Sequence, residues 1–292
     1  MEFGNMRIGL YLSESKDLGK LRDRIAQAAD DGFPSAWISN IFGLDALTAL
    51  AVAGSQVPGI ELGTAVVPTY PRHPGVMAQQ AMTANAALEG RLALGIGLSH
   101  QIVIENMYGY SFDKPARHMR EYLNVLLPLV RGEAADFTGE TLQGHMRLST
   151  PGAGMPVLIA ALAPRMLKLA DELADGTVLW MTGPKTVAEH VAPALRPGKR
   201  IVCALPVCVT DDVDGARAKA AEAFAVYGQL PSYRAMLDRE GAAGPGDVAI
   251  VGDEDSVRAQ IEALAKSGVT DFVASEYAEF PRTRQLLRTM LA

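Results

Sequence analysis

Apolar residues occur along this chain in short runs that alternate with segments of helical spacing. The runs are mostly continuous in their apolarity, as in strands buried on both faces of a parallel sheet. They predict eight strands, at residues 7–12, 35–39, 60–67, 91–96, 156–160, 176–180, 200–209 and 270–275. Between them, apolar side chains three and four residues apart predict amphipathic helices, whose stripes include Leu21 and Ile25, Met77 and Ala81, Met119 and Leu123, Met166 and Leu169, and Val257 and Ile261.

Eight buried strands that alternate with helices can close into a barrel or lie open as a doubly wound sheet. Because eight is the strand number of the TIM barrel, we predict an α/β fold of that kind, in one domain over residues 1–292. Three segments exceed the connections of a minimal barrel, at 101–114, 133–155 and 228–250. The second has the pattern of a hairpin, and long inserts of this type can cover an active face.

Composition and charge narrow the class of protein. The chain is 49% hydrophobic, enough for a large core, and its net charge of -6 is spread without a basic run, which argues against nucleic acid as a partner. No signal-like start or membrane-length apolar stretch is present, so we expect a cytoplasmic protein with no membrane partner. Cys203 and Cys208 lie five residues apart in one predicted strand, so they face opposite sides and are expected to be buried, unpaired thiols.

In a barrel, chemistry collects where the strands end at their carboxyl termini. These ends are poor in charge here, with no His-x-His pair, no carboxylate cluster and no Gly-x-Ser-x-Gly. The pattern argues against a metal site and against serine hydrolysis. It suits a flat, largely neutral ligand that contacts backbone groups and the residues at these ends, which include Ser39, Asn40, Gly97, Leu98, Ser99, His100, Ala161, Leu162, Thr182 and Gly183.

The stretch "RLALGIGLSH" (91–100) contains two glycines at the end of the fourth predicted strand. It lacks the third glycine of a dinucleotide-binding loop and comes too late in the chain for one. One interpretation is that a ligand's ring approaches the main chain at Gly95 and Gly97 more closely than a Cβ would allow. The alternative is that these glycines only relieve crowding inside the barrel.

Two segments, 61–100 ("ELGTAVVPTYPRHPGVMAQQAMTANAALEGRLALGIGLSH") and 251–273 ("VGDEDSVRAQIEALAKSGVTDFV"), resemble the luciferase-like flavin and deazaflavin oxidoreductase family, and within it the branch that uses coenzyme F420. The similarity extends thinly over nearly the whole chain. It implies an eight-stranded barrel with the cofactor across its carboxyl-terminal rim. It also implies a non-prolyl cis peptide at Ala65–Val66, whose bulge would press against the back of the cofactor's ring.

The same resemblance implies roles for further residues. Gly97, Leu98 and Ser99 would lie beside the ring. The segment Ala161, Leu162, Ala163 and Pro164 would receive the tail phosphate, as a helix N-terminus can, and Thr182 and Gly183 would flank that tail. Relatives are commonly dimers, so we expect a homodimer.

The chain departs from some relatives at the residues that move protons. Where those relatives carry an acidic residue and a histidine after the second strand, this chain has Asn40 and Ile41, and the acidic position after Gly-x-Gly is His100. His100 and Asn40 are therefore the catalytic candidates. His100 could protonate the substrate, or it could hydrogen-bond the cofactor instead. Because reduction of an electron-poor carbon needs less acid–base help than alcohol oxidation, reduction is the favoured reaction.

Three functions follow from these observations. The first is a coenzyme F420-dependent oxidoreductase that transfers a hydride between the deazaflavin and a small organic substrate, such as an imine, an activated alkene or a carbonyl. The second is an FMN-dependent monooxygenase on the same fold, and the third is a non-catalytic barrel that binds a flavin. Among other residues, Asp45 is predicted to cap a helix, and Trp37 and Trp180 to pack the barrel.

Overall fold

The computed structural model describes residues 6–152 and 154–291. Its eight barrel strands are all parallel and lie within two residues of the predicted bounds at nearly every end. They are β1 (Arg7–Tyr11), β2 (Ser35–Ile38), β3 (Glu61–Thr64), β5 (Leu92–Gly97), β8 (Val157–Ala160), β9 (Gly176–Trp180), β10 (Arg200–Val209) and β12 (Asp271–Glu276). Each pairs with its neighbours in the order β1-β2-β3-β5-β8-β9-β10-β12, and β12 returns to β1. The sheet is therefore closed, which confirms the TIM barrel and excludes the open doubly wound sheet.

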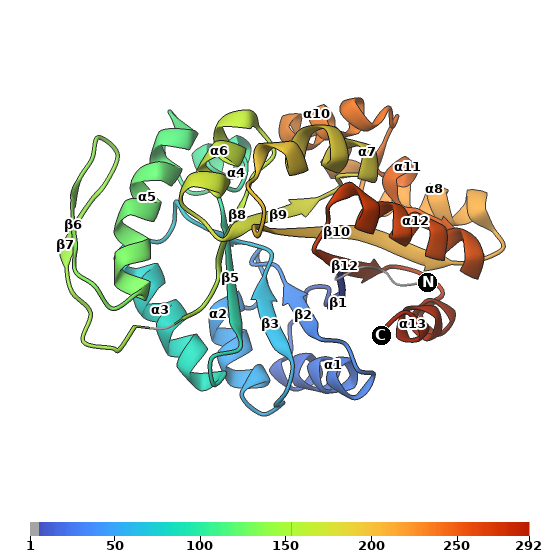
Figure 1. Ribbon diagram of the computed structural model, residues 1–292, viewed down its shortest axis with the longest axis horizontal. Helices are drawn as coiled ribbons and strands as arrows, with labels where there is room; N and C mark the ends of the chain where they lie inside the picture. The colour runs from blue at the N-terminus through green and yellow to red at the C-terminus, as the bar shows by residue number, and fades with distance from the viewer. Residues whose placement is uncertain (1–5, 153, 292) are drawn as a thin grey trace.

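Helices surround this barrel on the outside (Figure 1). The five predicted stripes form α1 (Leu18–Asp30), α3 (Pro74–Ala87), α5 (Pro115–Val130), α6 (Pro164–Glu172) and α12 (Glu254–Ser267). The remaining helical segments are α2 (Ala46–Ala49), η1 (Leu50–Gly54), α4 (Gln101–Asn106), α7 (Pro184–Thr186), η2 (Val187–Val191), η3 (Ala192–Ala194), α8 (Val213–Ala223), α9 (Ala225–Gln229), α10 (Pro231–Glu240), α11 (Pro245–Val248) and α13 (Phe280–Thr289). None of the helices in the described ranges is long and apolar enough to cross a membrane.

The expected hairpin is present as β6 (Ala135–Thr138) and β7 (Gln143–Met146), an antiparallel pair. It projects beyond α5 at the left of Figure 1 and packs against α5 and α3. The Glu121 carboxylate of α5 holds its tip by accepting the N–H groups of Glu140, Thr141 and Leu142. The expectation that this insert covers the active face is wrong, because its contacts tie it to the outer helices.

The third predicted strand is divided in two. After β3, residues Ala65 and Val66 bulge, and the chain resumes pairing with β5 as β4 (Val67–Pro68). Gly63 pairs with Ala93 and Val67 with Ile96. An advance of four residues from β3 to β4 therefore matches an advance of three residues along β5, which leaves one extra residue in the bulge. A further short strand, β11 (Ile250–Gly252), pairs with β10 outside the closed barrel and was not predicted. Its three residues are too few to show a period.

Inside the barrel, side chains form layers, as is usual for this fold. At the amino ends of the strands, Arg200 contacts Asp271 at 2.6 Å and Glu61 at 2.9 Å. The middle of the barrel is apolar and includes Trp37, which is fully buried as predicted. The layer nearest the carboxyl ends is only partly buried and consists of Tyr11, Ala65, Val66 and Trp180.

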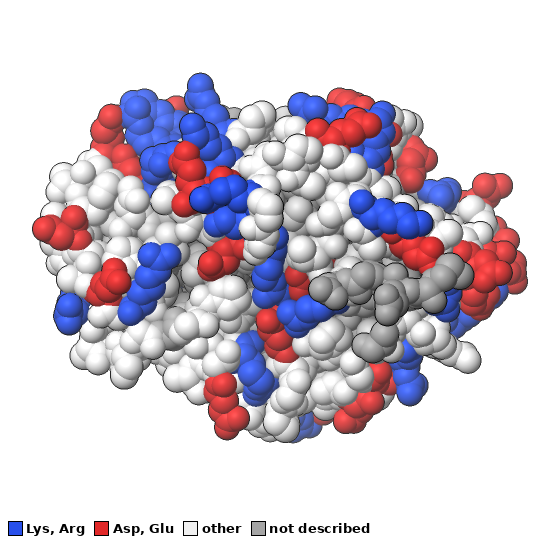
Figure 2. Space-filling model, viewed as in Figure 1, with Lys and Arg blue, Asp and Glu red and all other residues white. Residues whose placement is uncertain are grey.

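The two cysteines behave as predicted. Both are buried and free. Both lie on β10. The Cys203 side chain belongs to the main core between the strands and the surrounding helices, whereas Cys208 packs with Ala216 and Val251 under α8. Positive and negative side chains are interspersed over most of the face shown in Figure 2.

Candidate active site at the carboxyl-terminal rim

The bulge at Ala65–Val66 is the most distinctive backbone feature of the rim. The peptide bond between these residues is cis, as the resemblance implies. The β2 side holds it through two hydrogen bonds, from the Ala65 N–H to the Ile38 carbonyl (2.7 Å) and from the Asn40 N–H to the Val66 carbonyl (3.4 Å). On the β5 side, the Thr64 hydroxyl donates to the Gly95 carbonyl (2.7 Å) and accepts the Gly95 N–H (2.9 Å). The bulge is thus anchored on both sides and presents Ala65 and Val66, half-buried, to the rim.

Of the two interpretations of Gly95 and Gly97, the structure supports the second, that these glycines relieve crowding. A Cβ at Gly95 would collide with the Thr64 carbonyl oxygen, and one at Gly97 would lie 2.5 Å from Cγ2 of Val66. The space beside both glycines is therefore filled by the bulge of the neighbouring strand. Gly95 and Gly97 make room for the bulge, and the bulge, rather than the glycines, faces the rim.

Side-chain size is asymmetric around the rim. The strand ends on the β3, β5 and β8 side carry only Ala65, Gly97 and Ala160 at inward positions, with Val66 above Gly97. Tyr11 of β1 and Trp180 of β9, the strand next to β8, lie outside this group of strands, and their rings stack with centroids 5.9 Å apart. We call the small residues Ala65, Val66, Gly97 and Ala160 the seat, and the aromatic side chains that begin with Tyr11 and Trp180 the aromatic wall.

The aromatic wall continues into the inserted helices. Trp180 packs edge-on against Phe224 and Tyr227, both at 5.6 Å. Tyr227 meets Tyr233 of α10 at 5.2 Å, and Tyr233 in turn meets the His100 ring at 5.5 Å. The insert at 228–250 therefore lies at the rim, in contrast to the hairpin. Sequence reasoning missed this wall, although counting inward positions in twos from Gly9 would have placed Tyr11 on it.

The catalytic candidate His100 follows β5 as the N-cap residue of α4. The preceding residue, Ser99, has a left-handed backbone (φ 61°), which turns the chain sharply at the strand end. Burial lowers the pKa of His100, so the imidazole is uncharged at neutral pH. An uncharged ring favours the hydrogen-bonding role over that of an acid. Leu98 and Ser99 lie half-buried beside it, at the rim.

The other catalytic candidate, Asn40, is engaged by the protein. Its side-chain oxygen accepts the N–H of Ala46 at 2.9 Å, which fixes the loop before α2. Asp45 caps that helix through the Thr48 N–H, as predicted, and pairs with Arg72. Asn40 therefore positions backbone beside the bulge.

The predicted tail-phosphate segment divides into two parts. Ala163 and Pro164 are exposed at the start of α6, where no side chain caps the helix, and Arg165 is exposed next to them. Ala161 is buried and Leu162 half-buried beneath this turn, where the Leu162 carbonyl contacts His190 Nε2 at 2.7 Å. The α6 start thus has the free backbone donors and positive end that an anion requires.

Thr182 and Gly183 do not fit the role that the resemblance implies. Thr182 is buried and its hydroxyl donates to the Trp180 carbonyl, while Glu240 covers Gly183. The Glu240 carboxylate already accepts the N–H groups of Lys185 and Thr186 at the start of α7. This helix start is occupied by the protein's own anion, which would repel a phosphate.

A buried histidine supports the strand that follows the bulge. Thr69 donates its N–H to the Gly97 carbonyl and contacts His118 Nε2 through its hydroxyl at 3.1 Å. The His118 ring stacks on Tyr70 at 4.0 Å, and burial lowers the pKa of His118 to about 4. The neutral imidazole is therefore the form that fits this position.

We expect His118 to make the protein acid-sensitive. Because its pKa falls from 6.5 to about 4 on folding, its full contribution to stability exists above pH 6.5 and is lost as the pH falls from there toward 4. Between pH 7.5 and 5.0 the loss should be about 2 kcal/mol. Urea unfolding of His118→Gln at both pH values should show a correspondingly smaller change than the wild type. The exposed His145→Gln is the control, and equal changes in all three proteins would contradict the assignment.

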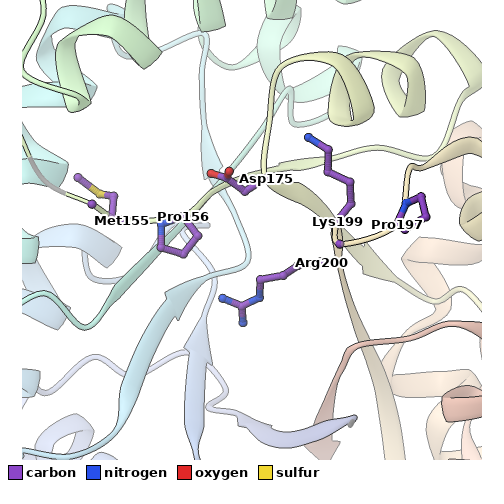
Figure 3. A pocket seen from close by; sticks show the side chains of 8 residues that line it. Met155, Pro156, Asp175, Pro197, Lys199 and Arg200 are labelled. Atoms are coloured by element: carbon purple, nitrogen blue, oxygen red, sulfur yellow. The ribbon is translucent and has the colours of Figure 1, made fainter. Parts of the chain in front are cut away.

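Among the described residues, no group of three or more His, Cys, Asp or Glu could hold a metal ion. A hollow of about 520 Å³ lies at the opposite end of the barrel, at the amino ends of β8, β9 and β10 (Figure 3). Its charged groups are already paired, since Lys199 donates to the Ala174 carbonyl, Asp175 accepts the Val157 N–H and Arg200 binds two carboxylates. The carboxyl-terminal rim is therefore the candidate site.

The fold and rim define a (β/α)8 barrel with a bulged third strand. The sequence profile of the luciferase-like monooxygenase family matches residues 3–271, so the chain belongs to this family. It is 26% identical to the 5,10-methylenetetrahydromethanopterin reductase of Methanolobus tindarius, over 92% of this chain and 94% of that protein. The corresponding reductase of Archaeoglobus fulgidus is 29% identical over 89% and 78% of the two chains.

Among solved structures, the coenzyme F420-dependent tetrahydromethanopterin reductase of Methanopyrus kandleri superposes with a TM-score of 0.83, covering 99% of both chains at 22% identity. At that identity the likeness establishes the fold alone. The resemblance that the sequence indicated is thus confirmed at the level of family and architecture.

Proposed function

We propose that this protein is a coenzyme F420-dependent oxidoreductase that transfers a hydride between the deazaflavin and a small organic substrate, such as an imine, an activated alkene or a carbonyl. The observation that carries the proposal is the anchored Ala65–Val66 bulge beside a seat of small residues. When bound, the cofactor supplies the hydride, and the protein supplies its orientation and the substrate pocket.

The residues present fit such a group. A planar ring placed on the seat would contact Ala65, Val66 and Ala160 on one side, with Leu98 and Ser99 at its edge. Larger side chains at these positions would fill the seat. Ala163, Pro164 and the exposed Arg165 at the α6 start suit the negative charge of a phosphate tail.

The aromatic wall would then face the ring from the side of β1 and β9. Its members are neutral at pH 7, since burial raises the pKa of Tyr11, Tyr227 and Tyr233. A wall of neutral aromatic groups favours an uncharged, unsaturated substrate over a carboxylate or a sugar phosphate. It also excludes water from the reacting atoms.

Direct binding distinguishes the cofactors. Fluorescence titration of the purified protein with oxidised coenzyme F420 and with FMN should show tight binding of the deazaflavin. The variant Ala160→Leu places a branched side chain in the seat and should weaken F420 binding at least tenfold, a loss of about 1.4 kcal/mol. The exposed Ala188→Leu on η2 serves as the matched control. Tight FMN binding without F420 binding would overturn the proposal.

The family description, luciferase-like monooxygenase, supports FMN-dependent oxygen chemistry as the second candidate. Oxygen consumption that depends on reduced FMN would favour it.

A non-catalytic flavin-binding barrel is the third candidate, and any reductive turnover with an imine, alkene or carbonyl probe would rule it out. We further propose that the protein is a cytoplasmic homodimer. Light scattering would measure its mass in solution.

A further inference from the structure

The hydroxyl groups of Tyr11 and Ser39 form a pair at the carboxyl ends of β1 and β2. Their oxygens lie 2.7 Å apart, and either can be the donor. The Tyr11 ring is also fixed by its stack on Trp180. Both residues are half-buried, so one side of the pair remains open at the rim. The phenol is thus held at two points, by its ring and by its oxygen.

This pair lies directly beside the bulge. Ser39 is the residue between Ile38, whose carbonyl accepts the Ala65 N–H, and Asn40, whose N–H donates to the Val66 carbonyl. The two hydrogen bonds clasp the cis peptide, so Ser39 is opposite it across the β2–β3 pairing. The Tyr11 hydroxyl is attached at this point and has no other partner among the described residues.

Other groups at the rim are less suited to give up a proton. Asn40 is committed to the loop before α2 through its side-chain oxygen. His100 lies at the far end of the aromatic wall, beyond Tyr233. Tyr227 and Tyr233 belong to the inserted helices and have no hydroxyl partner in the described chain that could restore a lost proton. Tyr11 has such a partner in Ser39.

Burial raises the pKa of Tyr11, while the hydrogen bond from Ser39 opposes this effect; Glu14 raises the pKa further and Arg24 lowers it. The phenol is therefore protonated throughout the neutral range. A neutral phenol donates a hydrogen bond to a substrate heteroatom and stabilises the negative charge that develops there.

We propose that Tyr11 is the catalytic proton donor of this enzyme and that Ser39 is the positioning residue that returns the proton. The proposal rests on the proposed function. As the hydride that the reduced cofactor supplies adds to the electrophilic carbon, the π electron pair moves to the attached oxygen, nitrogen or conjugated acceptor. The Tyr11 O–H bond breaks and its proton goes to that atom. The phenolate regains its proton in one concerted relay, in which the Ser39 hydroxyl passes its proton to the phenolate while taking one from a solvent water, and the medium neutralises the hydroxide that remains.

The variant Tyr11→Phe removes the hydroxyl and keeps the ring that stacks on Trp180. With 2-cyclohexenone as the probe, kcat should fall about 100-fold while KM and the affinity for F420 change less than threefold. Ser39→Ala should lower kcat about tenfold. The control is Tyr122→Phe on α5, which removes another buried phenol hydroxyl, one that donates to the Arg72 carbonyl.

A second readout does not depend on turnover. In the complex with oxidised F420 and 2-cyclohexenone, the infrared carbonyl stretch of the probe should shift to lower frequency in the wild type and in Tyr122→Phe, and should return toward its value in water in Tyr11→Phe. An unchanged shift in Tyr11→Phe, or no shift in the wild type, would overturn the assignment of Tyr11. If F420 itself does not bind, the proposed function fails instead, so the two failures are distinguishable.

Discussion

An alanine at position 95 is expected to lower the free energy of unfolding by about 3 kcal/mol, at the upper end for overpacking a core. The new Cβ would collide with the Thr64 carbonyl oxygen, a backbone atom of a residue whose hydroxyl group is itself hydrogen-bonded to the Gly95 N–H and carbonyl. Either β3 or β5 must therefore shift. Urea unfolding at pH 7.5 would measure the loss.

The same variant tests the link between the bulge and the cofactor. Because the shift displaces Ala65 and Val66, F420 affinity of the folded protein should fall at least tenfold. Gly154→Ala is the control, since a Cβ there would meet no atom within 4 Å. Stability and affinity equal to those of the control would show that Gly95 does not make room for the bulge.

Gly97 provides a graded comparison. A Cβ there would meet the end of the Val66 side chain, which can rotate, so Gly97→Ala should cost less than Gly95→Ala. Combining Gly97→Ala with Val66→Ala removes the contact and should recover part of the loss. Non-additivity of this kind is expected for residues in direct contact.

The second large effect is expected at the other end of the barrel. Arg200→Met should lower the free energy of unfolding by about 3 kcal/mol, because it leaves two carboxylates without their main partner. The Asp271 side chain is only 3% exposed, and the remaining cation, Arg7, is 3.4 Å from it and more exposed. Thermal and urea unfolding would measure the change.

Arg200→Met also separates stability from function. The ion cluster lies at the amino ends of the strands, below Trp37 and the apolar middle layer, so F420 affinity of the folded variant should equal that of the wild type. The double variant Arg200→Met with Asp271→Asn should be more stable than the single one, since it removes the buried unpaired charge. A single variant as stable as the wild type would contradict the role of the cluster.

The strands and main helices could be predicted because their signals are local. A run such as "VLIA" at β8 is apolar at every position, since both its faces are buried, and prolines at 74, 115 and 164 mark helix starts. The cis peptide at Ala65–Val66 was expected from the resemblance and not from the pattern, which shows one unbroken strand there.

The positions that the sequence could not place depend on contacts between residues that are far apart in the chain. The two interpretations of Gly95 and Gly97 stay open at the level of sequence, because the sequence does not show which groups of the adjacent strand lie over them. The resemblance implies that Thr182 and Gly183 flank the cofactor tail, whereas Thr182 is buried and Glu240, more than fifty residues later, covers Gly183. The hairpin was expected over the rim, and contacts with Glu121 hold it on the outer helices.

The order of residues determined the elements, the count of eight strands and the family, because periodic burial and short motifs are written within a few neighbouring positions. Closure of the barrel and docking of α10 decided the rest. The side chains of the aromatic wall are far apart in the chain, and they meet only when register and packing bring the strand ends to one rim. They form a chain of contacts from Tyr11 through Trp180, Tyr227 and Tyr233 to His100. Side-chain contacts across such separations depend on the three-dimensional arrangement, which no local pattern specifies.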